Sequence, residues 1–257
     1  MFTKIFAFAY RNWIFAKRNF FAFTEIVFWP FVSLVAIGLM GNFLDLKGNL
    51  VNFVLTGAIT GGVLQVTQLD VSYSLLYDIW SKSLKHTFLA PVTPYHFVLG
   101  SWLIGMIRGS VVFVLLAAVS YASFSFTLPS IGMTLIFVSG IYLNALVIGM
   151  MVCFLVMLFG QRVEITAWSL ATLAMLISGI YYPVSYLPAW VMHIASVIPL
   201  TFFLEHFRAG YGFTPVFSYP LAKGYALLAA YLLLFFWALR YAFERSRRSG
   251  MILRLSE

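Results

Sequence analysis

Residues Tyr77–Gly100, YDIWSKSLKHTFLAPVTPYHFVLG, form the longest polar interruption between two strongly apolar stretches in the first half of the chain. The acidic, basic and histidine side chains of this segment are Asp78, Lys82, Lys85, His86 and His96. Two prolines, Pro91 and Pro94, lie between the histidines. A segment this long and amphipathic, held between two membrane spans, predicts a helix that lies on the membrane surface. Such a helix is well placed to receive a push from a soluble partner in the cytoplasm.

The composition is that of a polytopic membrane protein. Of the 257 residues, 62% are hydrophobic and only 9% are charged, whereas a soluble domain has about 25% charged residues. The mean hydropathy is +0.95. The 16 Lys and Arg residues outnumber the 8 Asp and Glu residues, but most basic residues lie at the edges of apolar runs. This placement indicates membrane topology and anionic lipid headgroups as partners, and it argues against nucleic acid.

Residues 1–25 are predicted to form an amphipathic helix at the membrane interface. At about 100° per residue, one face is apolar and carries Phe2, Ile5, Phe6, Ala9, Trp13, Ala16 and Phe20. A cationic stripe on another face, formed by Lys4, Arg11 and Arg18, is expected to lie among lipid phosphates. These cations also interrupt any apolar core of a signal peptide. The alternative is a poorly formed first span.

Residues 26–257 are predicted to form one all-α transmembrane domain with six spans. The spans are expected at about Ile26–Phe43, Asn52–Tyr73, Phe97–Tyr121, Ile131–Phe159, Ile165–Tyr182 and Leu221–Phe243. Residues 77–97 connect two spans on the cytoplasmic side. Residues 183–220 are interrupted by prolines into apolar pieces too short to cross a bilayer, which needs about 20 residues. This region is therefore predicted to form two short re-entrant helices on the outer side, at about Pro188–Val197 and Leu200–Ala209.

The basic residues orient the predicted spans. With both termini in the cytoplasm, most basic residues lie in cytoplasmic segments, and the outer segments hold only Lys47, Arg208 and Lys223. This asymmetry is a strong orientation signal. Two small-residue patterns, Gly57–Gly61 and Gly105–Gly109, permit close approach of helices.

The sequence carries no catalytic or cofactor-binding motif. It lacks the G-x-x-x-x-G-K-[ST] phosphate loop, the H-E-x-x-H metal motif and paired cysteines with metal-ligand spacing. Its four histidines are scattered, and the single Cys153 lies inside an apolar run. We therefore expect a non-catalytic chain with no metal and no cofactor of its own, which needs an energy source elsewhere if it transports a substrate.

Charged residues inside predicted spans are functional candidates, because a charge in a bilayer is costly. Asp70 and Arg108 lie at depths that allow an ion pair between the second and third spans. The pair would either transmit motion of the Tyr77–Gly100 segment into the spans or simply staple two helices together. A second cluster near the outer face, formed by Glu205, His206 and Arg208, would either neutralise its own charges or line an exit route.

Two groups of residues resemble a known family. The first comprises Phe88-Leu-Ala-Pro-Val-Thr-Pro94, Val98-Leu-Gly100 and Arg108-Gly109, and the second comprises Ile177-Ser-Gly-Ile-Tyr-Tyr-Pro183, Leu187-Pro-Ala-Trp190, Ile198-Pro-Leu200 and Phe207-Arg208. They resemble the L-x-[AS]-P-V-x-x…G and S-G-x-x-x-P…L-P-x-W…x-P-L…R signatures of class-two bacterial ABC exporter permeases. That group includes nodulation-factor, drug, O-antigen and teichoic-acid exporters. The resemblance covers essentially the whole chain and is specific for the family but weak for the substrate.

The resemblance implies a permease that pairs with a second permease copy, as a homodimer or heterodimer, and with two ABC ATPase subunits that bind ATP and Mg²⁺. It also implies a location in the bacterial inner membrane. Met1–Phe23 would be the elbow helix and Asp78–Leu89 the coupling helix seated in the ATPase. The residues expected to serve ATPase coupling are Asp78, Lys82, Lys85 and His86, although the lysines would also satisfy the positive-inside rule alone. The outer gate would contain Pro183, Trp190, Glu205 and Arg208.

The substrate is only weakly indicated by the sequence. Aromatic residues of the predicted pathway, Phe28, Trp29, Phe31, Trp168, Tyr181 and Tyr182, would stack on sugar rings or would instead be lipid-facing anchors. The scarcity of acidic residues disfavours a dedicated cation exporter. We expect a lipid-linked glycan or another amphipathic molecule first and a hydrophobic drug second. A channel or a membrane-embedded enzyme is disfavoured, because the spans show no polar stripe and no catalytic pair.

Overall fold

The computed structural model describes residues 2–18 and 20–248, and all regular secondary structure in them is helical. The predicted all-helical membrane fold is thereby confirmed at the level of fold class. The helices are α1 (Phe2–Arg18), α2 (Phe20–Phe43), α3 (Asn49–Trp80), α4 (Leu84–Leu89), α5 (Pro94–Phe124), α6 (Ile131–Phe159), α7 (Thr166–Ile177), α8 (Ala189–Ala195), α9 (Pro199–Ala209) and α10 (Pro220–Arg248), with 3-10 turns at Gln161–Val163 and Val184–Tyr186. The last part of the predicted transmembrane domain, with Arg254, lies outside the described residues, as do the side chains of Ala16 and Phe20.

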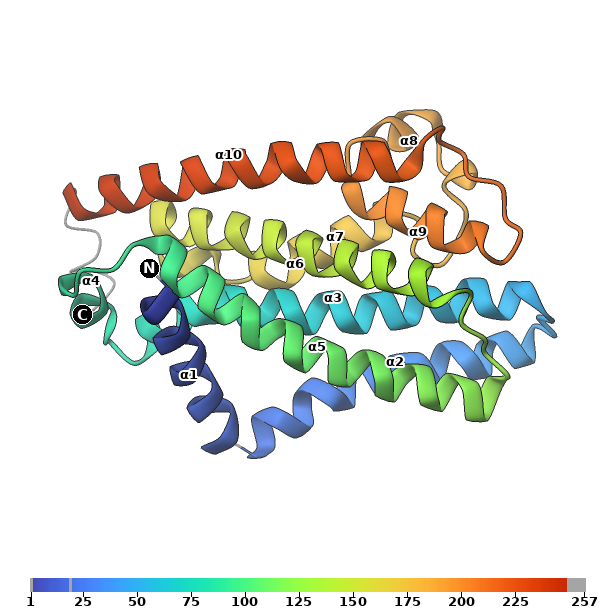
Figure 1. The fold of residues 1–257 in the computed structure, drawn as a ribbon, viewed down its shortest axis with the longest axis horizontal. Helices are drawn as coiled ribbons and strands as arrows, with labels where there is room; N and C mark the ends of the chain where they lie inside the picture. The colour runs from blue at the N-terminus through green and yellow to red at the C-terminus, as the bar shows by residue number, and fades with distance from the viewer. Residues whose placement is uncertain (1, 19, 249–257) are drawn as a thin grey trace.

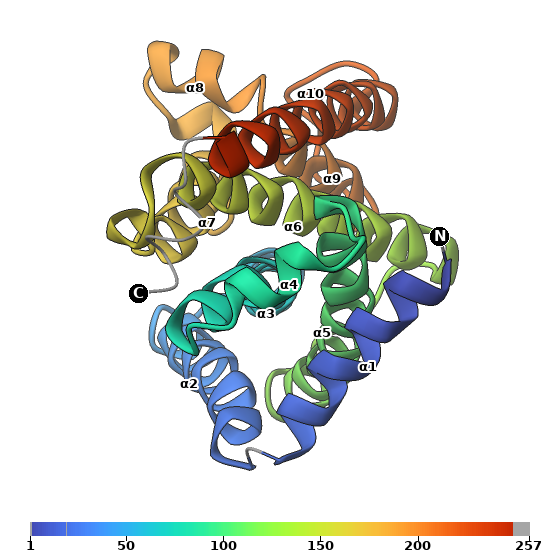
Figure 2. The same cartoon turned by 90° about the vertical axis from the view of Figure 1, so that its left-hand side faces the viewer.

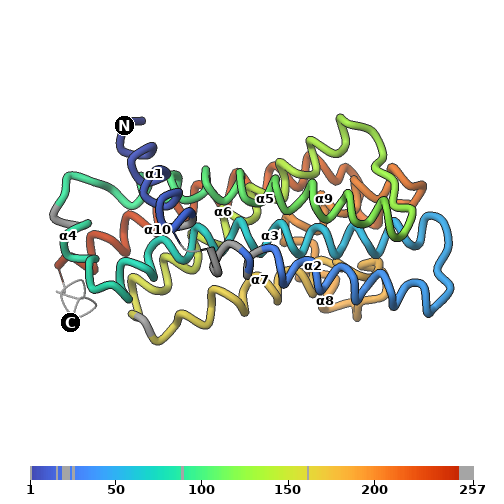
Figure 3. The backbone as a smooth tube through the Cα atoms, turned by 90° about the horizontal axis from the view of Figure 1, so that it is seen from below, coloured from blue at the N-terminus to red at the C-terminus, as the bar shows by residue number. Residues whose placement is uncertain are grey.

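Helix α3 runs through the middle of an elongated bundle and packs against α2, α5, α6 and α7 (Figure 1). Seen from below, α7 and α8 lie on one side of α3, and α5 lies on the other (Figure 3). The bundle has two ends. We call the end with α4 and the start of α1 the α4 end, and the end with α8 and α9 the α9 end. Helix α3 is buried around its whole circumference from Leu55 to Thr60, as expected for the central helix of a bundle.

Within the part of the chain that the structure describes, four helices, α3, α5, α6 and α10, are long and apolar enough to cross a membrane. The α8–α9 pair is bent by 92° and would make a fifth span if it counts as one. The other two predicted spans correspond to shorter apolar helices, Val27–Phe43 and Thr166–Ile177. Helix α7 ends at Ile177, before the turn at Gly179, where φ is +69°. The count of six spans therefore stays a prediction.

The boundary between the second span and the connecting segment differs from the prediction. The sequence suggested that the span ends near Tyr73 and that the coupling helix covers Asp78–Leu89. Helix α3 instead continues to Trp80, and α4 begins only at Leu84. The extension is stabilised by edge-to-face contacts of Tyr73, Tyr77 and Trp80, whose ring centroids lie 5.4–5.6 Å apart. Asp78 therefore belongs to α3.

Candidate functional site

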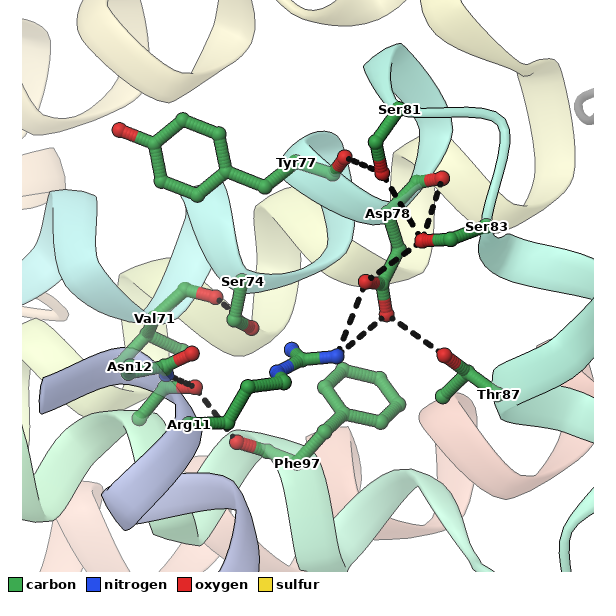
Figure 4. Close-up of polar contacts among 11 residues, drawn as sticks. Arg11, Asn12, Val71, Ser74, Tyr77, Asp78, Ser81, Ser83, Thr87 and Phe97 are labelled. Atoms are coloured by element: carbon green, nitrogen blue, oxygen red, sulfur yellow. Dashed lines mark hydrogen bonds and ion pairs between the residues drawn. The ribbon is translucent and has the colours of Figure 1, made fainter. Parts of the chain in front are cut away.

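Four helices, α1, α3, α4 and α5, come together at the α4 end (Figure 2). A single carboxylate joins three of them. Arg11 on α1 donates from Nη1 to both oxygens of Asp78, at 2.9 and 3.0 Å. Ser83, just before α4, donates to Oδ1 at 3.2 Å, and Thr87 on α4 donates to Oδ2 at 3.1 Å (Figure 4). We call these four residues the Asp78 node.

The Asp78 node is mostly withdrawn from solvent. The side chain of Asp78 is only 10% exposed, and that of Arg11 is 28% exposed. Both carboxylate oxygens have charged and hydroxyl donors, so the desolvated charge is compensated. Chemically the node contains a cation, a carboxylate and two hydroxyls, and both carboxylate oxygens have donors, whereas the buried Nε of Arg11 has no hydrogen-bond partner in the part of the chain that the structure describes. It is a mechanical joint between elements and not a reactive centre.

The chain folds locally so that α4 turns back onto Asp78. After α3 ends, Lys82 adopts a left-handed backbone conformation with φ of 55°. The amide of Ser83 then donates to the carbonyl of Asp78 at 2.9 Å. Leu84, the first residue of α4, is buried. At the other edge of the segment, the amide of Thr93 donates to Nδ1 of His96 at 2.9 Å, which fixes the start of α5.

Helix α1 lies across α5 in close contact (Figure 2). A Cβ atom at Gly100 would lie 2.6 Å from the carbonyl oxygen of Ile5 and 2.7 Å from Cβ of Phe8, so only glycine allows the helices to approach this closely. The rings of Phe8 and Phe97 meet edge to face at 6.4 Å. Asn12 adds a hydrogen bond of 2.6 Å to Ser101.

The prediction that the cationic stripe of α1 lies among lipid phosphates is wrong for Arg11 and stays a prediction for Lys4 and Arg18. Lys4 donates to the carbonyl oxygen of Pro91, and Arg11 pairs with Asp78. The contact of Lys4 is exposed, whereas the pair of Arg11 and Asp78 is partly buried. Arg18 is exposed. The face of α1 that remains exposed is aromatic and carries Phe2, Phe6, Tyr10 and Trp13.

Substitution of Gly100 by valine is expected to displace α1 from α5, because the new side chain would overlap the α1 backbone. Overpacking of this kind costs about 1–3 kcal/mol. Thermal unfolding of the purified protein in detergent measures the loss. The matched control is Gly132→Val, since a Cβ at Gly132 would meet nothing within 4 Å. Equal unfolding temperatures for the two variants would contradict the close approach of α1.

The predicted ATPase-coupling residues occupy two different environments. Lys82, Lys85 and His86 are exposed on the surface of the 82–86 segment. Asp78 lies beneath them and is 7% exposed. Its carboxylate therefore holds the segment from inside, and the exposed side chains form the surface that another protein can reach.

Polar and aromatic contacts also join the last turns of α3 to the turn before α7 and to the start of α7. The indole of Trp80 donates to Glu164 at 3.1 Å, and that of Trp168 donates to the hydroxyl of Tyr73 at 2.8 Å. The ring of Phe15 on α1 stacks with that of Tyr77 at 6.4 Å. Motion of the end of α3 would therefore reach α1 and α7 as well as α4.

The predicted pathway residues are partly exposed. Phe28 and Trp29 on α2 pack edge to face with each other at 5.5 Å. Trp168 contacts Tyr73, as described above, and Tyr182 donates to the carbonyl of Leu176. Tyr181 is 40% exposed and Trp168 is 45% exposed. This exposure is compatible with a substrate pathway and equally with lipid anchoring, so both interpretations stay open.

The structure places Asp70 and Arg108 in direct contact. Nη1 of Arg108 on α5 pairs with Oδ1 of Asp70 on α3, and the side chains are 12% and 15% exposed. Asp70 lies two helical turns before Asp78, about 12 Å away along α3 at 1.5 Å per residue. The intramembrane pair and the Asp78 node thus lie on the same helix.

At the α9 end, Arg208 and Glu205 have separate partners. Arg208 is buried and donates to the backbone carbonyls of Gly179 at 2.8 Å, Phe53 at 3.3 Å and Ile180. Its guanidinium lies 3.5 Å from the centroid of the Phe53 ring. Glu205 accepts from the amides of Val216 and Phe217, each at 3.2 Å. No ion pair within 4.0 Å joins Arg208 to Glu205 in the part of the chain that the structure describes.

The remaining predicted gate residues lie nearby in the chain. Pro183 precedes the 3-10 turn Val184–Tyr186, and Trp190 on α8 is 69% exposed. Sequence reasoning missed Arg11, Ser83 and Thr87 as partners of Asp78. One signal was present, because a lone aspartate amid apolar residues needs a nearby cation once it is buried.

Comparison with known proteins identifies relatives of this chain. A sequence model of a family described as "ABC-2 type transporter" matches residues 3–211, which include α1 to α9 and the Asp78 node. An uncharacterized protein of Archaeoglobus fulgidus is 54% identical over 44 residues, which is 17% of this chain and 69% of that protein.

Proposed function

Because this chain belongs to the ABC-2 type transporter family, we propose that it is the membrane-spanning subunit of an ATP-driven exporter. ATP and Mg²⁺ are bound by two separate ABC ATPase subunits, and a second permease copy completes the transporter. The observation that carries this proposal is the arrangement of residues 81–93. This segment is pinned from inside by Asp78 and presents Lys82, Lys85 and His86 outward. A polar surface segment that is held firmly to the spans can transmit a conformational change of a soluble ATPase to the membrane protein.

In this proposal the α4 end faces the cytoplasm, with both termini on that side of an inner membrane. Helix α1 is the elbow helix at the interface, and α4 is the coupling helix. Helix α2 and the predicted span Ile165–Tyr182, which contains the 12-residue α7, complete six spans with α3, α5, α6 and α10. Helix α2 has 24 residues, or about 36 Å at 1.5 Å per residue, which is long enough to cross. The bent α8–α9 pair closes the outer side.

We further propose an amphipathic substrate such as a lipid-linked glycan. Half-exposed aromatic rings, for example those of Trp168 and Tyr181, stack well on sugar rings. Acidic side chains that would attract a cationic drug are scarce in the chain. The alternative substrate, a hydrophobic drug, would use the same rings without the sugar.

The test is co-expression and co-purification of this chain with a candidate ABC ATPase subunit, followed by ATP turnover in lipid. Reversing the charge of Lys82 or Lys85 to glutamate is expected to weaken the complex or its turnover about tenfold, which corresponds to about 1.4 kcal/mol. The matched control is Lys47→Glu, because Lys47 is 79% exposed at the opposite end of the bundle. If the wild-type chain binds no ATPase, or if all three variants behave alike, the proposed function is wrong.

A further inference from the structure

We propose that Arg11 is a positioning residue for residues 81–89, which include α4 and which we call the coupling segment. In this proposal α1 and the coupling segment move as one unit. This inference rests on the proposed function only for its consequence in transport. Its structural part concerns the folded chain alone. Arg11 lies far from the segment in the sequence, yet it supplies the cation that the buried carboxylate of Asp78 needs.

The donors around Asp78 come from two different parts of the chain. The hydroxyls of Ser83 and Thr87 come from the segment itself, whereas the charged donor comes from α1. Figure 4 shows the guanidinium and both hydroxyls meeting the carboxylate from different elements. Within residues 2–18 and 20–248, Arg11 is the cation that forms an ion pair with Asp78. Without it, a nearly buried carboxylate would keep only neutral donors, and the turn would open to let water in.

Helix α1 has its own attachment to the bundle. Its backbone rests on Gly100, and Phe8 packs against Phe97. Asn12 bonds to Ser101. None of these contacts involves α4. Loss of the Arg11 guanidinium should therefore loosen residues 81–89 while α1 stays on α5.

The Asp78 node connects residues 81–89 to α1. The exposed face of α1 carries Phe2, Phe6, Tyr10 and Trp13, the composition of a helix that rests on a membrane surface. A push on α4 would then reach Asp78 and, through Arg11, a helix held by the bilayer. Because α1 is held at the membrane surface, it restrains the coupling segment. The motion of the coupling segment is thereby directed into α3.

Hydrogen–deuterium exchange of the full chain in lipid nanodiscs tests this inference. In Arg11→Gln, amides of residues 84–89 are expected to exchange at least tenfold faster than in the wild type, while those of residues 5–9 are unchanged. The matched control is Lys17→Gln on the same helix, since Lys17 is exposed. Arg11→Lys, which keeps the charge, should restore part of the protection. Unchanged exchange in Arg11→Gln, or equal acceleration in Lys17→Gln, would overturn the proposal.

Two further measurements keep the outcome decisive. If Arg11→Gln does not fold, the Ser83→Ala, Thr87→Val double variant retains both charges. It should speed exchange of residues 84–89 several-fold, and no change would refute the joint. In the complex with the ATPase, Arg11→Gln should lower turnover while the subunits stay associated. If the wild type binds no ATPase but the exchange result holds, the proposed function fails and the positioning role of Arg11 stands.

Discussion

Replacement of Arg108 by alanine is expected to destabilise the protein severely. The guanidinium of Arg108 on α5 pairs with the carboxylate of Asp70 on α3, and both side chains are largely buried. Removal of one partner of a buried pair costs about 3–5 kcal/mol, because the remaining charge is neither solvated nor compensated. In a chain of this size such a loss lowers Tm by about 10 °C. Thermal unfolding in detergent, followed by circular dichroism, measures the shift.

A surface ion pair provides the control. Arg240 contacts Glu244 at 3.1 Å, but these side chains are 70% and 53% exposed, so Arg240→Ala should cost less than about 1 kcal/mol. The double variant Asp70→Leu, Arg108→Met removes both buried charges and should regain most of the lost Tm. Equal Tm values for Arg108→Ala and Arg240→Ala would contradict a buried pair.

The double variant also separates the two roles that the sequence left open for Asp70 and Arg108. A staple holds helices together and does nothing else, so an apolar replacement that restores Tm should restore ATP turnover in the complex too. If the pair instead transmits motion of the Tyr77–Gly100 segment into the spans, it needs both charges to do so. Restored Tm with lost turnover would therefore favour transmission.

The parts of the fold that depend on local hydropathy could be predicted from the sequence. The predicted spans at Phe97–Tyr121 and Ile131–Phe159 correspond to α5 and α6. The prolines of residues 183–220 indicated two short helices, which the structure has as α8 and α9. Apolar length and proline positions are properties of a short stretch of chain, so they need no knowledge of tertiary contacts.

The Asp78 node could not be predicted in the same way. The sequence predicts that Arg11 meets lipid phosphates and that Asp78 meets an ATPase, because a polar residue beside a membrane usually meets a polar phase. The structure turns both inward, since α1 crosses α5 at Gly100 and brings its cationic face over the end of α3. The contact of α1 with α5 determines which face of α1 is turned toward the bundle. The periodicity of the α1 sequence alone does not predict this contact.

The two small-residue patterns look alike in the sequence but have different uses. At Gly105, a Cβ would lie 2.9 Å from the carbonyl oxygen of Thr67, so this pattern lets α5 approach α3 as expected. Gly57 faces the carbonyl of Ile180, in the turn after α7. Because the spacing of both patterns is the same, only the structure distinguishes helix packing from contact with a turn.

Gly57→Ala is expected to disrupt the contact between α3 and the turn after α7 at the α9 end. This loss is expected although alanine favours a helix by about 1 kcal/mol over glycine. The new Cβ would overlap the carbonyl oxygen of Ile180 and lie 2.9 Å from its carbon. That carbonyl has little freedom to move away, because buried Arg208 donates to it and to the carbonyl of Gly179. Overpacking against a fixed backbone should cost about 3 kcal/mol, or about 10 °C in Tm.

Gly61→Ala is the matched control, because both glycines lie on α3 in the same pattern. A Cβ at Gly61 would make only ordinary contacts, 3.4 Å from Cδ1 of Ile180 and 3.6 Å from Sδ of Met175. Its Tm should equal or exceed that of the wild type, since the propensity gain acts without a clash. If Gly57→Ala is also neutral, the turn after α7 is free to move and Arg208 does not hold the α9 end closed. If only Gly57→Ala loses Tm, then α3, the turn after α7 and α9 are held together at this contact.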